Sequence, residues 1–134
     1  MANISEIEGI GPAYAEKLED AGIQTVEALL EKAAQPEARK RIAADSGVPE
    51  KSLLRWVNMA DLFRINGVGE EYADLLERAG VDTVVELSRR NAENLHDKMK
   101  SINAEESLVR ALPSAGTVEK WVAHAKELPR AVHY

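Results

Sequence analysis

The sequence has 134 residues, of which 23 are acidic and 17 basic, so its formal net charge is −6. It contains no cysteine, which excludes a disulfide scaffold, an iron–sulfur cluster, zinc held by thiolates and a thiol nucleophile. Hydrophobic residues make up 45% of the chain and charged residues 30%, a balance typical of a folded protein. The apolar stretches are short, and the first residues lack a signal-like pattern, so we expect a cytoplasmic protein without a membrane-spanning segment.

Helical patterns dominate the first half of the chain. Pro12 directly after Gly11 is typical of the first turn of a helix. Apolar residues then recur with a period near 3.6 as far as Gly22, which is predicted to end this helix in the left-handed conformation. Thr25 is predicted to cap the next helix, and a looser helix is expected over 36–45. An amphipathic helix follows, with the apolar stripe Leu53, Trp56, Val57 and Ala60.

The second half of the chain repeats this order. A shift of 58 positions aligns residues 7–26 with residues 65–84, and eleven of the twenty pairs are identical. The two tryptophans lie 65 positions apart, each in an amphipathic helix, and a looser helical segment is expected over 91–110. Because the agreement involves scarce residue types, we interpret it as an internal repeat.

No segment shows the sustained alternation of a β-strand. The sequence therefore predicts an all-α protein with two units, residues 1–62 and 63–134, packed into one globule. Each half carries a formal charge of −3, with eight basic and eleven acidic residues in 1–64 and nine and twelve in 65–134. Neither half is a basic arm.

Three patterns predict the N-caps of further helices. In each, a Ser, Thr or Asn is followed three residues later by Glu, a spacing that satisfies two free backbone amides at once. The three pairs are Ser5 with Glu8, Thr83 with Glu86 and Asn103 with Glu106.

The segment Ile7–Pro12 predicts a tight turn between two helices. Gly9 and Gly11 allow backbone angles that a side chain disfavours, and Ile10 between them is expected to point inward. Such a turn exposes backbone amides at the start of the following helix, where they can bind an anion.

In the first copy, the exposed amides would be those of Gly11, Ala13 and Tyr14, since Pro12 has no N–H. The paired tyrosines, Tyr14 and Tyr72, are most simply core residues whose hydroxyls lie at the surface or bond a hairpin carbonyl. The paired tryptophans are likewise expected in the core.

This pattern, an apolar residue, any residue, Gly, an apolar residue and Gly before a helix, resembles the helix-hairpin-helix family. Members of that family often bind the DNA backbone without reading its sequence, and tandem copies often pack as a pseudo-symmetric pair. Nearly the full chain, including Leu128–Tyr134, also resembles the bacterial family called domain of unknown function 4332. Together with the repeat, the helix-hairpin-helix resemblance implies two pseudo-symmetric units of about 60 residues. The resemblance to family 4332 implies no particular activity.

The charge at each hairpin decides whether phosphate can bind there. Phosphate-binding members often carry a basic residue just past the second glycine, where this sequence has Pro12-Ala13 and Glu70-Glu71. A helix N-terminus favours an anion by about 0.3–1 kcal/mol. One carboxylate at about 4 Å opposes it by about 1 kcal/mol in water and about 4 kcal/mol at an effective dielectric of 20. The second hairpin is therefore predicted to be structural, with Gly67, Gly69, Glu70 and Glu71 as its residues.

Basic residues supply most of the affinity for a nucleic-acid backbone, through counterion release. Lys17 lies about one and a half helical turns beyond the first hairpin, and residues 39–41 are the densest basic cluster. The alternative interpretation is that these cations belong to solvated helix faces. The predicted interface consists of Gly9, Gly11, Ala13, Tyr14, Lys17, Arg39, Lys40 and Arg41.

Nothing in the sequence predicts catalysis, a metal site or a cofactor. The three histidines, His96, His124 and His133, have no partner at metal-ligand spacing, and there is no Gly-rich loop ending in Lys-Ser or Lys-Thr. We therefore expect a non-enzymatic module that binds duplex DNA weakly and without sequence preference. The alternative is a protein-interaction or scaffolding module with purely structural hairpins, which the net negative charge and the pair Glu70 and Glu71 favour.

Overall fold

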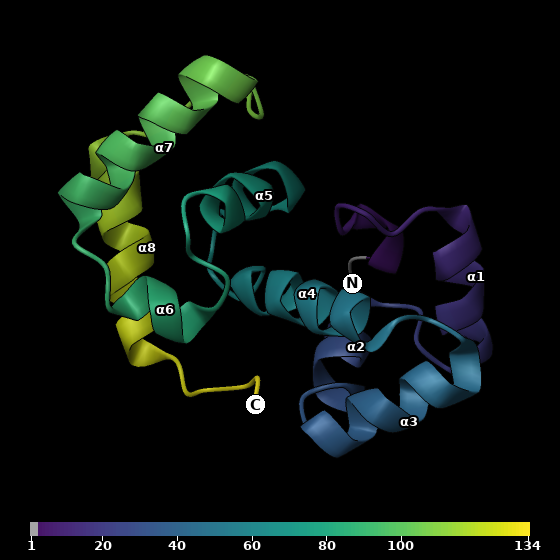
Figure 1. Ribbon diagram of the computed structural model, residues 1–134. Helices are drawn as coiled ribbons and strands as arrows, with labels where there is room; N and C mark the ends of the chain where they lie inside the picture. The colour runs from purple at the N-terminus through teal and green to yellow at the C-terminus, as the bar shows by residue number, and fades with distance from the viewer. Residues whose placement is uncertain (1–2) are drawn as a thin grey trace. The chain divides into compact units, whose positions relative to one another are not determined.

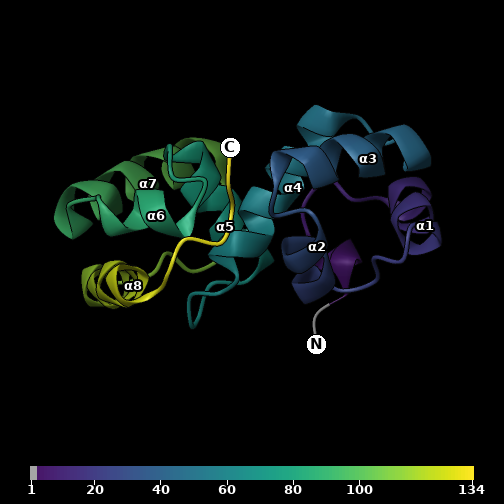
Figure 2. The same cartoon turned by 90° about the horizontal axis from the view of Figure 1, so that it is seen from below.

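A computed structural model describes residues 3–134, and its contacts divide the chain into two compact units (Figure 1, Figure 2). Unit 1 contains Met1–Asp61 together with Ala131–Tyr134, and unit 2 contains Leu62–Arg130. The last four residues thus group with unit 1, whereas the division drawn from the sequence placed them in the second half. Within residues 3–134, all regular secondary structure is helical, apart from an isolated bridge between Asn3 and Thr25, which confirms the all-α class.

Unit 1 begins with the 3-10 helix η1 (Ile4–Glu6). The helices α1 (Pro12–Asp20), α2 (Val26–Lys32), α3 (Pro36–Ser46) and α4 (Glu50–Leu62) follow, and only the last residue of α4 belongs to unit 2. α1 contacts both η1 and α3. The core is aliphatic around one indole, as the low aromatic content requires, and its buried side chains include Ile4, Ile7, Leu18, Ile23, Leu29, Leu53 and Trp56.

Unit 2 contains α5 (Glu70–Arg78), α6 (Val84–Ser88), α7 (Ala92–Glu106) and α8 (Ala115–Glu127). α8 packs against α6 and α7, and α7 also contacts α5 (Figure 2). The core is formed by apolar residues of these helices together with Val81 of the loop between α5 and α6; the helical ones include Leu75, Leu76, Leu87, Leu95, Met99 and Trp121.

The threonine N-caps were predicted correctly, and the other two capping patterns were wrong. The Thr25 hydroxyl accepts the Ala28 N–H at 3.0 Å, and Thr83 plays the same part for α6. At the chain start, Asn3 rather than Ser5 caps η1. Asn103 lies inside α7, where its side chain accepts the N–H of a residue in the following loop at 2.9 Å. Both predictions failed because neither residue is at the start of a helix, and a side chain can cap a helix only there.

Each sharp turn before α1 and α5 is closed by the same backbone bond. The Ile10 N–H donates to the Ile7 carbonyl at 3.1 Å, and the Val68 N–H donates to the Ile65 carbonyl at the same distance. Left-handed glycines occur in both turns and after both following helices, as the sequence predicted for Gly22. They are Gly9, Gly22, Gly67 and Gly80, with φ of 94°, 87°, 90° and 92°.

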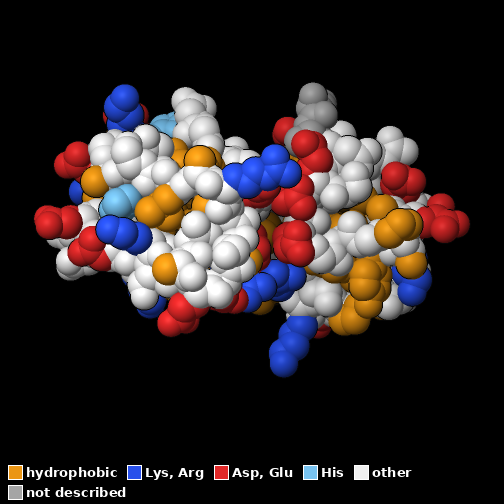
Figure 3. Space-filling view, turned by 90° about the horizontal axis from the view of Figure 1, so that it is seen from above, with side chains coloured by type: hydrophobic (Ala, Val, Ile, Leu, Met, Phe, Trp, Pro, Cys, Tyr) orange, Lys and Arg blue, Asp and Glu red, His pale blue; other side chains and the backbone are white. Residues whose placement is uncertain are grey.

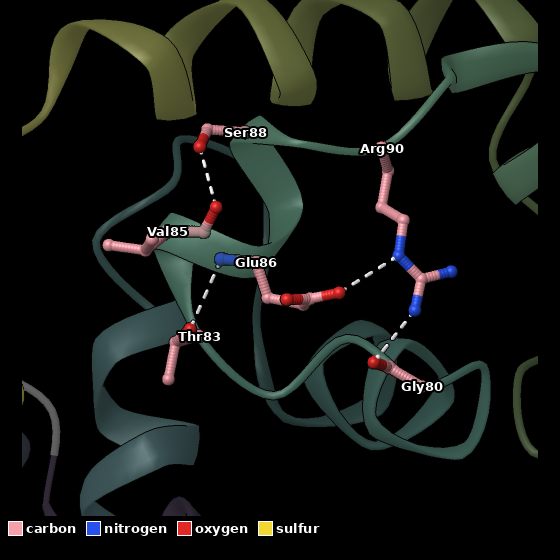
Figure 4. A network of polar contacts seen from close by, with 6 residues as sticks. All are labelled: Gly80, Thr83, Val85, Glu86, Ser88 and Arg90. Carbon is pink, nitrogen blue, oxygen red and sulfur yellow. Dashed lines mark hydrogen bonds and ion pairs between the residues drawn. The ribbon is translucent and has the colours of Figure 1, made fainter. Parts of the chain in front are cut away.

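A basic side chain closes the end of α1 and of α5. The Lys32 ammonium donates to the Gly22 carbonyl at 2.8 Å. In unit 2, Arg90 donates to the Gly80 carbonyl at 2.9 Å and also pairs with Glu86 at 3.2 Å (Figure 4). A cation at this place satisfies a carbonyl that the helix leaves without an intrahelical donor.

Candidate nucleic-acid interface

The first turn of α1 is open and free of acids. Gly11 is the N-cap, without a side-chain cap, and Pro12 occupies the first helical position. The first intrahelical bond is donated by Ala15 to Gly11 at 2.9 Å, so the amides of Ala13 and Tyr14 have no intrahelical acceptor. Because no acidic residue lies in this turn, the positive end of the helix dipole is not neutralised by its own side chains.

Aromatic contacts fix the side chains beside this turn. The Tyr14 ring meets the Trp56 ring edge-on, with 5.1 Å between centroids, and Trp56 is buried. The Lys17 ammonium lies 5.7 Å from the centroid of the Tyr14 ring, within the range of a cation–π interaction. Lys17 is therefore held beside the residues that carry the open amides.

Arg55 of α4 also lies against the first hairpin, a contact that the sequence analysis missed. A Cβ atom added to Gly9 would lie 2.9 Å from Nη1 of Arg55 and 3.3 Å from the indole nitrogen of Trp56. The available signal was a basic residue directly before each tryptophan, which in the second half is Lys120. Lys120 lines a depression together with Gly67 of the second hairpin.

The structure removes Arg39 from the predicted interface. Its side chain is 3% exposed, its Nη1 donates to the carbonyls of residues 33–34 at 2.9 Å, and its Nη2 donates to the His133 carbonyl at 2.6 Å. Lys40 and Arg41 are exposed. Successive helical residues point about 100° apart, so three consecutive cations cannot share one face. Arg39 therefore donates to carbonyls of its own unit and is not directed at a ligand.

Acidic residues lie beside Lys17, one of the cations that remain accessible. Lys17 lines a depression between α1 and α3 together with Asp20 and Asp45. On the face drawn in Figure 3, acidic and basic side chains are intermingled on each unit, and no continuous basic stripe is visible. On this face, few cations are placed to take part in counterion release.

The second hairpin has the same backbone, but two acidic residues follow it where the first hairpin is followed by Pro12-Ala13. Gly69 is the N-cap of α5, and the exposed carboxylates of Glu70 and Glu71 stand in its first turn. The Tyr72 hydroxyl donates to the Ala111 carbonyl at 2.8 Å, an exposed bond in the loop after α7; of the two expected places, this is the surface and not a hairpin carbonyl. Glu70 and Glu71 line a depression with Arg110, so this turn favours a cation over a phosphate.

The loop between α5 and α6 carries a carboxyl group, that of Asp82, whose pKa the fold shifts. Burial of the carboxyl of Asp82, which as a residue remains exposed, raises its pKa above the ordinary value of 3.8. The charges of Glu86 and Glu77 raise this pKa further, whereas its own backbone amide and Arg90 act in the opposite direction. The folded unit therefore disfavours the ionised form of Asp82 relative to the protonated form.

The histidines make structural contacts. His96 Nε2 lies 2.9 Å from the Pro113 carbonyl, and His124 Nδ1 accepts the Asn66 N–H at 3.3 Å. Among the residues that the structure describes, no three His, Asp or Glu side chains gather as metal ligands. In the same residues, no helix combines the length and apolarity needed to cross a membrane.

Comparison with known proteins finds one family. The family whose sequence pattern matches residues 8–128 is described as a domain of unknown function, DUF4332. The matched residues include both hairpins and both tryptophan-bearing helices. No solved structure matches the chain.

Proposed function

The chain belongs to the DUF4332 family, and from the geometry of its first hairpin we propose that it binds the backbone of duplex DNA weakly and without sequence preference. In this proposal both turns are helix-hairpin-helix motifs of an internal repeat, and only the first keeps a phosphate site. The protein acts in the cytoplasm as a binding module, without catalysis.

The open, acid-free first turn of α1 carries the proposal. A phosphate oxygen would accept the N–H groups of Ala13 and Tyr14, and the ammonium of Lys17 would neutralise its charge. Arg55, against the same turn, supplies a second cation. The binding constant should fall by about 0.9 logarithmic units per neutralised phosphate for each tenfold rise in salt. With few cations taking part, the total slope should be small.

The experiment is a titration of a short labelled DNA duplex with the full chain at roughly 50 mM and roughly 200 mM salt. We expect binding at the lower salt that weakens by roughly tenfold at the higher, as for two neutralised phosphates. Lys17→Ala should weaken binding and reduce the salt slope by about one. Lys100→Ala, an exposed cation on α7, is the matched control and should leave both unchanged. Absence of binding at the lower salt rejects the proposal.

The second hairpin favours one other function. Its exposed pair, Glu70 and Glu71, fits a basic segment of another protein, which corresponds to a protein-interaction or scaffolding module. A labelled oligolysine peptide distinguishes the two functions. Binding of this peptide that Glu70→Gln with Glu71→Gln abolishes, without any binding of DNA, would support the interaction module.

A further inference from the structure

The last four residues, Ala131–Tyr134, belong to unit 1 as a segment outside any helix. Val132 is 2% exposed, whereas Tyr134 is 65% exposed. Grooves that bind extended peptides contact them in a similar way, with individual side chains buried in pockets and others left exposed.

Both main-chain groups of His133 are bound by unit 1. Its N–H donates to the Ala34 carbonyl at 2.9 Å, and its carbonyl accepts Nη2 of Arg39 at 2.6 Å. Main-chain contacts of this kind hold a segment regardless of the side chain at that position. Two residues away from Val132, the Tyr134 hydroxyl donates to Oδ1 of the buried Asn58 at 3.1 Å.

Arg39 is positioned by unit 1 itself. Its Nη1 donates to the carbonyls of Ala33 and Ala34, so the guanidinium keeps its place without the terminal segment. Its Nη2 is directed at the His133 carbonyl, and the side chain as a whole is 3% exposed. The guanidinium therefore presents a positioned N–H donor to any main-chain carbonyl that takes the place of this segment.

We propose that unit 1 carries a binding groove for an extended peptide in which an aliphatic residue precedes a tyrosine by two positions. The residues that read the peptide are Ala34 and Arg39 for the main chain and Asn58 for the tyrosine hydroxyl. The terminal segment of the chain occupies this groove in cis and competes with the peptide. The proposal does not use the first hairpin, so it stands or falls separately from DNA binding.

The test uses the full chain and a fluorescent synthetic peptide with the sequence of residues 129–134, followed by anisotropy. Val132→Asp places a charge at a buried position and expels the terminal segment from the groove. If the wild type has an open groove in about a tenth of its molecules or fewer, this variant binds the peptide at least about tenfold more tightly. Tyr134→Phe removes one hydroxyl and should tighten binding by roughly two- to fivefold. Circular dichroism checks that both variants remain helical.

Changes in the peptide test the contacts without altering the protein. A peptide methylated on the His133 nitrogen lacks the N–H for Ala34 and should bind Val132→Asp roughly fivefold more weakly. A peptide with Asp in place of Val132 should not bind. Equal affinity of the methylated peptide, or no gain in either protein variant, overturns the proposal. A concentration-dependent dimer of the wild type that Val132→Asp abolishes would overturn the cis arrangement, because the segment would then come from a second copy.

Discussion

The two hairpins share one backbone design, but the helix after the first begins without a charged residue and the helix after the second begins with two carboxylates. Their left-handed glycines have φ of 94° and 90°, and the following tyrosines contact a buried tryptophan with ring centroids 5.1 Å and 5.3 Å apart. The next helix begins with Pro12-Ala13 in one unit and Glu70-Glu71 in the other. The comparison teaches that glycines and aromatic contacts define the turn, while the two residues after it decide which ion the turn attracts.

The largest effect expected in either unit comes from its core. Leu18 and Leu76 lie 58 positions apart and are both 0% exposed. We expect Leu18→Ala and Leu76→Ala each to lower the free energy of unfolding by about 2–5 kcal/mol, because a cavity replaces a packed side chain. Urea unfolding measures both. A loss below about 1 kcal/mol in one variant alone would show that the two cores are not comparable.

The hairpin glycines should cost less to replace. Gly9→Ala and Gly67→Ala each place a Cβ on a left-handed backbone, for which we expect a loss of about 1–2 kcal/mol. Gly9→Ala should be the worse of the two, because its Cβ would approach Trp56 to 3.3 Å and displace Arg55, whereas Gly67→Ala leaves 3.4 Å to the indole of Trp121. Urea unfolding of the two variants measures both losses. The reverse order would mean that the surroundings of the two turns differ from those described.

The cations that close the ends of α1 and α5 should contribute still less. Arg90→Ala removes the bond to the Gly80 carbonyl and the pair with Glu86, and we expect a loss of about 1–1.5 kcal/mol. Lys32→Ala removes a single bond to the Gly22 carbonyl, and about 0.5–1 kcal/mol is expected. Thermal unfolding of the two variants gives the comparison. Equal losses would show that the pair with Glu86 adds nothing.

The smallest expected effect is a pH-dependent change in stability, which unit 2 should show at Asp82 and unit 1 should not show at the corresponding position. Burial and the acids around Asp82 raise its pKa in the folded protein, so its contribution to stability is fully present below the ordinary value of 3.8 and is lost as pH rises through the raised pKa. Asp82→Asn should therefore raise the melting temperature at pH 7 and have no such effect below about pH 3.8. At the corresponding position unit 1 has Gln24, and Gln24→Ala is the control without a pH-dependent effect. A gain at pH 7 that persists below pH 3.8 would contradict this account.

Much of the fold could be predicted because it depends on neighbouring residues. Pro12 begins a helix, Gly22 ends it and Thr25 begins the next through interactions within a few positions of the chain. Capping at Ser5 and Asn103 was predicted by the same rule and is wrong. At the chain start the capping box is formed two positions earlier, by Asn3 and Glu6, and Asn103 lies within α7, whose N-cap is Asn91.

The candidate site was harder to predict because its parts are distant in sequence. The open amides after the first hairpin follow from Gly11 and Pro12, but Arg55 approaches Gly9 of this hairpin from another helix. Arg39 looked like part of a basic cluster, yet its partner His133 lies 94 positions away. No local pattern indicates that the last residues of the chain return to unit 1.

The most direct test of the account is one DNA titration of two matched variants, Gly11→Asp and Gly69→Asp. Neither added Cβ would meet an atom within 4 Å, and both glycines have negative φ, so both proteins should fold. An N-cap Asp accepts the first-turn amides and changes helix stability by only a few tenths of a kcal/mol relative to Gly. We predict that Gly11→Asp abolishes binding at roughly 50 mM salt and that Gly69→Asp leaves it unchanged. Equal affinity of Gly11→Asp and the wild type, with the same salt slope, would contradict the account.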